Sequence, residues 1–191
     1  NLHRDEVREW DNPYYGFPQM VRFAFHPNES SRKKMEELKS HGISYALSEL
    51  LKPQSITKDT KNNLHKKFKH EVEVLDLFKV IDGSKKDENI LNFLDYEKIQ
   101  EGKMCRHIVC VLPYRASCDA IEALFKREKF KNLGEYEVIN ISGVESDKKY
   151  KTTQSVQFKI KDCESKNKKT ITLTVNRMLT GSTVPQWDTM L

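Results

Sequence analysis

The sequence predicts an α/β protein in which helices cover a parallel β-sheet. Residues 107–112 form a nearly continuous apolar run, which is typical of a central parallel strand. Residues 136–141 alternate cleanly between apolar and polar side chains, and residues 170–175 alternate between apolar and hydroxyl-bearing ones, as strands do. A helical pattern follows the first run. Strand, helix and strand in this order imply parallel strands that are joined by right-handed crossovers.

The helix after the first strand is predicted from one apolar face. Ala120, Ile121, Leu124 and Phe125 share that face, and Ser117 is the expected N-terminal cap. Residues 155–161 fit either a helix or a strand, because their apolar positions alternate while two lysines face away.

Upstream of this portion the sequence favours helices. Residues 30–39 suit a short helix, and residues 64–78 carry apolar side chains at spacings of four and three. The other face of that second helix is expected to hold solvated lysines, including Lys66, Lys67 and Lys69. A third helix is expected between Ile90 and Gly102.

These patterns divide the chain into three parts. Residues 1–29 are a proline-containing connector and a first strand, and residues 30–103 are a helical flank or insertion. Residues 104–191 are the α/β portion. The chain lacks an initial methionine and stops where a new apolar segment begins, so we expect it to be a piece of a larger protein.

Composition excludes several classes of protein. The net charge is +5, which is compatible with a polyanionic partner without requiring one. No window is apolar enough to cross a membrane, and no signal peptide is recognisable. The four cysteines lack the CxxC spacing of zinc sites, so we expect buried, reduced thiols in a cytoplasmic protein.

The sequence has no phosphate-binding loop of the GxxxxGK type. The segments Gly83-Ser84-Lys85 and Gly102-Lys103 lack the earlier glycine of this loop: the required position is Lys79 before Lys85 and Glu97 before Lys103. His107 lies inside an apolar strand, and no Ser–His–acid or paired-carboxylate spacing stands out. The sequence therefore shows no group of catalytic residues that would support an independent enzyme.

The C-terminal strand leads into a loop that contains Gly181 and ends at Pro185. Open α/β sheets bind ligands outside the carboxyl ends of their strands, and glycine allows a close approach of the backbone to a ligand. Spacing alone also fits an ordinary exit from a strand.

The residues of this loop resemble a known motif. NRMLTGSTVPQWDTML, residues 176–191, is similar to motif V of the superfamily-two helicases, especially in the second motor lobe of type I and type III restriction-type DNA translocases. Gly181 takes the place of the motif's glycine, Val184-Pro185 that of the following pair, and Asn176 that of the polar residue at the start. Thr183 stands where the family usually has an aspartate, so it keeps a hydrogen-bonding group without the charge.

The resemblance implies a RecA-like fold, and it assigns residues to two ligands. One side of the motif V loop would face ATP through Gly181 and Thr183, and the other side would face nucleic-acid phosphates through Thr174, Asn176 and Thr180. The strand, loop and helix around residues 107–127 resemble motif IV. They add Arg115 and Ser117 as nucleic-acid contacts, and the loop after the next strand adds Ser142 and Gly143. Simple helix capping by Ser117 and a surface position for Arg115 remain an alternative.

The function implied is that of one motor lobe. ATP and magnesium would bind between this lobe and a first lobe that is absent from the sequence, and DNA would be the partner. The piece alone is expected to bind no cofactor, to hydrolyse no ATP and to contact no membrane. A different class remains open: a self-contained α/β binding or scaffold module with an accidental likeness to motif V.

Overall fold

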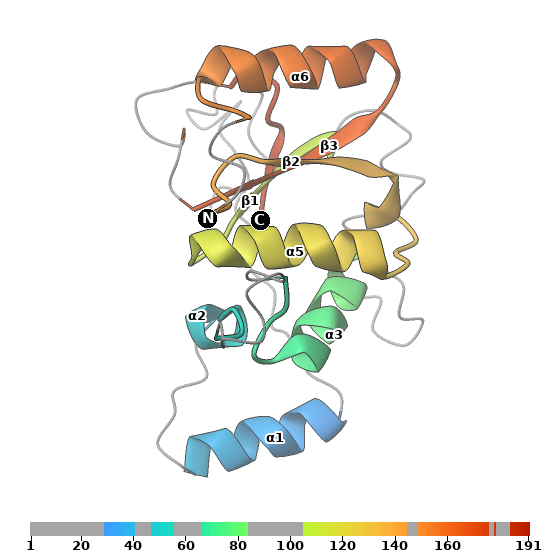
Figure 1. Ribbon diagram of the computed structural model, residues 1–191. Helices are drawn as coiled ribbons and strands as arrows, with labels where there is room; N and C mark the ends of the chain where they lie inside the picture. Colours follow the sequence, from blue (N-terminus) through green and yellow to red (C-terminus); the bar gives the residue numbers. More distant parts are fainter. Residues whose placement is uncertain are drawn as a thin grey trace, which may run out of the picture.

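The computed structural model describes residues 29–40, 47–55, 66–83, 105–144, 149–175, 178 and 184–191. Figure 1 shows the ribbon. The helices are α1 (Glu29–Ser40), α2 (Leu47–Leu50), α3 (Glu71–Ile81), α5 (Arg115–Arg127) and α6 (Thr153–Ser165), with a 3-10 turn at Leu133–Glu135. The strands are β1 (His107–Val111), β2 (Tyr136–Asn140), β3 (Lys169–Thr174) and β4 (Thr189–Met190).

All four strands run parallel in a single sheet with the order β2-β3-β1-β4. β3 is central: His107 of β1 pairs with Thr170 on one side, and Tyr136 of β2 pairs with Lys169 on the other. The prediction of a parallel α/β sheet is confirmed. The apolar segment expected near the C-terminus is the short strand β4, which extends the sheet beside β1.

Helices cover both faces of the sheet. α5 lies on one face and α6 on the other, with α2 and α3 beyond α5 (Figure 1). The core on the α5 side joins Leu51, Val74 and Phe78 to sheet residues such as Ile108 and Leu173. The β1-to-β2 connection runs through α5 and the β2-to-β3 connection runs through α6, in opposite directions along the sheet. Because the two helices lie on opposite faces, both crossovers have the same hand.

Residues 155–161, for which the sequence left a helix and a strand open, lie in the helix α6 (Thr153–Ser165). Thr152 caps it: its hydroxyl accepts a hydrogen bond from the Ser155 N–H, while the Ser155 hydroxyl accepts one from the Thr152 N–H. This reciprocal capping box satisfies two amides that a helix start otherwise leaves unpaired. Val156, Ile160 and Cys163 then share the buried face.

The predicted amphipathic helix over residues 64–78 is wrong in its start, and its apolar face is correct at Leu75 and Phe78 but not at Val72. α3 begins at Glu71, and Phe68 instead forms an antiparallel bridge with Pro53. Glu71 accepts a hydrogen bond from the Phe68 N–H at 2.8 Å, which fixes the chain just before the helix. Val72 is 64% exposed, and Val74 takes the buried position. Lys66, Lys67 and Lys69 therefore precede the helix and do not form its basic face.

The four cysteines are buried and free, as expected for reduced thiols. Burial is the main cause that raises the pKa of Cys110 and of Cys118 to about 12, so both remain protonated small hydrophobes. No helix among the described residues is long and apolar enough to span a membrane.

Asp82 joins α3 to the loop between α5 and β2. Its buried carboxylate accepts hydrogen bonds from the backbone N–H groups of Lys131, Asn132 and Leu133 at 2.8, 2.8 and 2.6 Å. The Asn132 amide donates in turn to the Asp82 carbonyl. This side chain thus ties the end of α3 to the loop before β2, in addition to the apolar contacts of the core.

We predict that Asp82→Ala lowers the free energy of unfolding by about 3 kcal/mol, because it leaves several buried N–H groups without an acceptor. Urea unfolding followed by circular dichroism measures the change. Asp162→Ala is the control, since Asp162 pairs with Lys166 on the exposed side of α6. Equal midpoints for both variants would contradict the role of Asp82.

His107 occupies the amino edge of β1. It is 3% exposed, its Nδ1 lies 2.9 Å from the Thr170 hydroxyl, and its Nε2 lies 3.3 Å from a Glu164 oxygen. Burial is the largest cause acting on it and lowers the pKa of His107, while Glu164 and Asp188 act in the opposite direction. Burial likewise lowers the pKa of His70.

Both histidines make stability depend on pH. The unfolded chain takes up their protons first, so the full stability is present above the unfolded pKa of about 6.5 and is lost as the pH falls from there through the lowered folded pKa. We predict that the free energy of unfolding, measured by urea titration, decreases as the pH is lowered from about 7.5 to 5.5. Each histidine contributes a slope of up to about 1.4 kcal/mol per pH unit. His107→Asn should flatten this slope, and Lys166→Gln should not. An unchanged slope in His107→Asn would contradict the prediction.

Candidate nucleic-acid interface

The carboxyl ends of the strands form one rim of the sheet. Just beyond β1, the Leu112 N–H donates to the Thr174 carbonyl at 2.8 Å, and just beyond β2, the Ile141 N–H donates to the Leu173 carbonyl at 3.1 Å. The turns after β1, β2 and β3 therefore leave the sheet at the same edge, as parallel pairing requires.

The chain leaves two neighbouring strands of this rim toward opposite faces. After β1 it enters α5 on one face. After β3 it reaches the other face, where Met178, Val184 and Trp187 pack with Ile139 and Ile160. The gap between the ends of β1 and β3 is therefore a topological switch point, the usual ligand position in open α/β sheets.

Arg115, at the start of α5, connects the end of β1 to the turn after β2 on this rim. Its Nε donates to the Ser142 carbonyl and its Nη2 to the Gly143 carbonyl, each at 3.1 Å. Because β3 separates β1 from β2, the guanidinium reaches across the carboxyl end of β3. Arg115 remains exposed to solvent. The structure thus brings together three of the residues that the resemblance assigned to nucleic acid.

Thr174 joins the same cluster from β3. Its hydroxyl lies 3.1 Å from that of Ser142, and both side chains are buried, at 0% and 4% exposure. The Gly143 N–H donates to the Asn140 side chain at 2.8 Å. These groups shape the turn after β2 from inside, so Arg115 is the member of the cluster that presents charge to solvent.

The carboxylate of Asp119 on α5 also holds the turn after β2. Asp119 accepts hydrogen bonds from the Val144 N–H at 2.7 Å and from the Asn140 side-chain amide at 2.9 Å. Sequence reasoning missed Asn140 and Asp119, because 21 residues separate them and neither stands in a recognisable motif. The exposed Tyr114, beside Arg115 on the rim, was also missed.

Ser117 is not the N-cap of α5 as expected, and its burial gives no support to the predicted nucleic-acid contact. Tyr114 is the N-cap residue of α5, and the Ser117 hydroxyl donates to the Leu51 carbonyl at 2.6 Å with 0% exposure. Two residues along a helix turn the side chain by about 200°, so Ser117 faces away from the side that carries Arg115. Its hydroxyl holds the end of α2 against α5.

The remaining predicted contacts, Asn176, Thr180, Gly181 and Thr183, lie outside the described residues. Among the residues that the structure does describe, no group of three histidine, cysteine or acidic side chains could hold a metal ion. The described part of the rim offers a fixed guanidinium instead. Such a group pairs well with phosphate, since it combines positive charge with several N–H donors.

Comparison with known proteins gives one similarity. The chain is 28% identical over 97 residues to a protein of Mycoplasma pneumoniae described as "Putative type II restriction enzyme and methyltransferase RM.MpnORF110P C-terminus". The match covers 51% of this chain and 13% of that protein, so the chain spans a small part of the relative's length. No family model matches the chain. No solved structure matches it either.

Proposed function

We propose that this chain is the second motor lobe of an ATP-dependent DNA translocase or helicase within a restriction-modification protein. Its rim would bind the phosphates of DNA. The parallel sheet fits a RecA-like lobe, and the similarity to a mycoplasma protein named as a restriction enzyme and methyltransferase supports the biological setting. The motor activity itself rests on the resemblance to motifs IV and V.

The contact between Arg115 and the turn after β2 carries this proposal. Two carbonyls hold the guanidinium at 3.1 Å, so part of its conformational freedom is already lost before a ligand arrives. An exposed and oriented guanidinium at the switch point is suited to a phosphate of the DNA backbone. Contacts of this kind position a duplex or a strand without reading its sequence.

In the motor, this chain would contact both the nucleotide and the DNA. ATP with magnesium would supply the free energy for movement, and this chain would approach the nucleotide through Gly181 and Thr183. Arg115 would hold a DNA phosphate at the rim, while Asp119 and Asn140 keep the neighbouring turn in place. Closing and opening of the cleft between the lobes would then move the gripped strand.

We predict that Arg115→Ala weakens the binding of a labelled DNA strand about five- to tenfold in fluorescence anisotropy, because one charge-assisted phosphate contact is lost. The salt dependence of log K should fall by about 0.7 to 0.9. Lys126→Ala is the matched control. It removes one charge from the far end of the same helix, where Lys126 pairs with Glu122. Equal losses in both variants would contradict a contact at the rim.

Hydrogen exchange separates DNA contact from support of the turn. In Arg115→Ala the amides of Gly143 and Val144 should exchange faster, and in Lys126→Ala they should not. Arg115→Lys keeps the charge but cannot bridge both carbonyls, so it should recover part of the DNA affinity while the turn still exchanges faster.

We also predict that the purified chain hydrolyses no ATP above background, with or without DNA, because the sequence has no GxxxxGK loop. A phosphate-release assay measures this. Turnover that Gly181→Ala abolishes would show that the assignment to a second lobe is wrong.

One observation favours a second candidate, a binding or scaffold module without motor activity. The turn after β2 is held by hydrogen bonds within the protein, including the pair of Ser142 and Thr174 hydroxyls, and it needs no ligand for its shape. In that case Arg115→Ala should lower the melting temperature and leave DNA affinity equal to that of Lys126→Ala.

A further inference from the structure

The net positive charge of the chain can be assigned to α6 and the segments that flank it. Residues 149–169 contain seven lysines and two acids, a net charge of +5 that equals the net charge of the whole chain. The remaining residues contain equal numbers of basic and acidic side chains. The electrostatic attraction of this protein for a polyanion therefore originates mainly from one helix and its neighbours, rather than from the rim.

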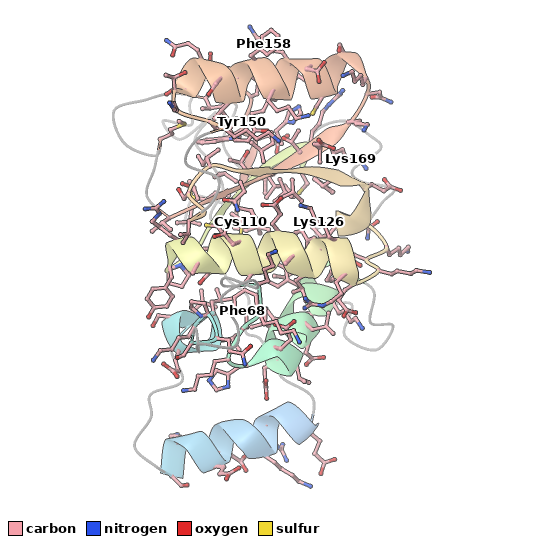
Figure 2. The ribbon with its side chains drawn as sticks, viewed as in Figure 1. Phe68, Cys110, Lys126, Tyr150, Phe158 and Lys169 are labelled. Atoms are coloured by element: carbon pink, nitrogen blue, oxygen red, sulfur yellow. The ribbon has the colours of Figure 1, made fainter. Side chains whose placement is uncertain are left out.

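Phe158 stands in the middle of this basic surface. It is 77% exposed, the largest exposure among the large apolar side chains of the described residues, and it projects outward from α6 (Figure 2). Val156, Ile160 and Cys163 supply the buried face of α6, so Phe158 has no part in the core. A single exposed apolar residue is ordinary; its position among lysines is the informative feature.

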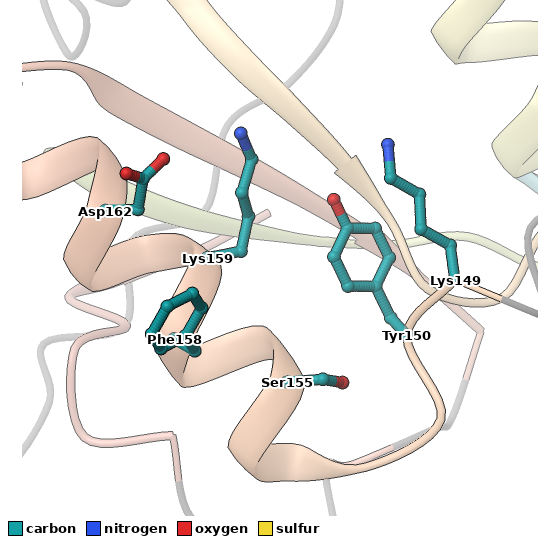
Figure 3. Close-up of a pocket in the computed structure, with 6 residues that line it drawn as sticks. All are labelled: Lys149, Tyr150, Ser155, Phe158, Lys159 and Asp162. Atoms are coloured by element: carbon teal, nitrogen blue, oxygen red, sulfur yellow. The ribbon is translucent and has the colours of Figure 1, made fainter.

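An open pocket of about 290 Å³ lies beside Phe158. Lys149, Tyr150, Ser155, Lys159 and Asp162 complete its lining, and Figure 3 shows the lysine and tyrosine side chains extending in a common direction next to the helix. The Lys149 ammonium lies 5.5 Å from the centre of the Tyr150 ring. The pocket thus combines an aromatic face, hydrogen-bonding groups and cationic side chains.

Part of the positive charge is neutralised locally. Lys159 and Lys168 pair with Glu137 at 3.0 and 4.0 Å, and Lys169 pairs with Glu135 at 3.4 Å; both acids lie outside residues 149–169. Lys166 pairs with Asp162 at 2.7 Å. The bond to Glu137 is the largest cause that raises the pKa of Lys159. Lys149 and Lys161 form no ion pair with another described residue, and both are exposed. Lys161 follows Phe158 by three residues, and Lys149 lines the pocket beside Phe158.

We propose that this α6 surface binds single-stranded nucleic acid, with a base stacked on Phe158 and the backbone phosphates on Lys149 and Lys161. An aromatic ring next to lysines is the pattern that holds unpaired strands, because every base offers a face for stacking. Duplex bases are already stacked and cannot use the ring. Phe158 lies on α6, on the face of the sheet opposite α5, so the proposal does not use the Arg115 contact (Figure 1).

Two other occupants fit the surface less well. Protein interfaces have few lysines at their centre, whereas here Lys149 and Lys159 line the pocket beside the aromatic ring. A helix that lies on a membrane needs an apolar face, and the apolar face of α6 is buried in the core.

The test uses the full chain and a fluorescein-labelled oligothymidine of about 20 nucleotides. Phe158→Ala should weaken its binding at least about fivefold in anisotropy, as expected for the loss of one base–aromatic stack. The affinity for a duplex of equal length should change less than about twofold. Val72→Ala is the control, since Val72 is an exposed apolar residue on α3, and it should have no effect. Phe158→Trp should keep the affinity and show quenched tryptophan emission when the strand binds.

The lysines are tested by salt dependence. Lys149→Gln with Lys161→Gln should lower the slope of log K against log salt by about 1.4 for a single strand. Lys66→Gln with Lys67→Gln removes the same charge from exposed positions before α3 and should lower it much less.

Equal effects of Phe158→Ala and Val72→Ala would overturn the proposal, as would binding to vesicles that contain phosphatidylserine without binding to the oligonucleotide. The rim is tested independently. If Arg115→Ala has no effect while Phe158→Ala weakens binding, the α6 surface stands and the proposed function fails; the reverse result rejects the α6 surface alone.

Discussion

The burial of three threonine hydroxyls along β3 is the constraint on which the sheet portion depends. β3 lies between β1 and β2, and Thr170, Thr172 and Thr174 are each 0% exposed. A buried hydroxyl without a partner is costly, so each one must find a hydrogen bond. The partners are His107, Trp187 and Ser142 in turn. One strand therefore fixes β1, the connection to β4 and the turn after β2.

The rim follows from the same constraint. The Ser142–Thr174 pair sets where the turn after β2 meets β3, and the Arg115 guanidinium then reaches the carbonyls of that turn from β1's side. Asp119 restrains the turn through the Val144 N–H. A positioned cation at the switch point thus results from packing and hydrogen bonding within the fold.

The net positive charge of the chain and the geometry of a ligand site lie in different parts of the fold. The rim has the geometry of a ligand site with one presented guanidinium, whereas α6 and its flanks hold the positive excess of the chain and an exposed aromatic ring. In a protein that handles DNA, these features would serve different steps. A broad basic surface attracts and retains a strand, and a fixed guanidinium sets its position.

Sequence determined the architecture because hydrophobic periodicity and chain order are local properties. The strands over residues 107–112, 136–141 and 170–175 were predicted within a residue or two, and their parallel order placed Arg115, Ser142, Gly143 and Thr174 on one rim. Only the tertiary structure decided how these residues meet, which side of α5 each residue occupies, and where α3 begins. Ser117 and Arg115 are two residues apart, yet one donates to the buried end of α2 and the other reaches across β3. The difference arises from contacts with segments distant in the chain, which no local pattern records.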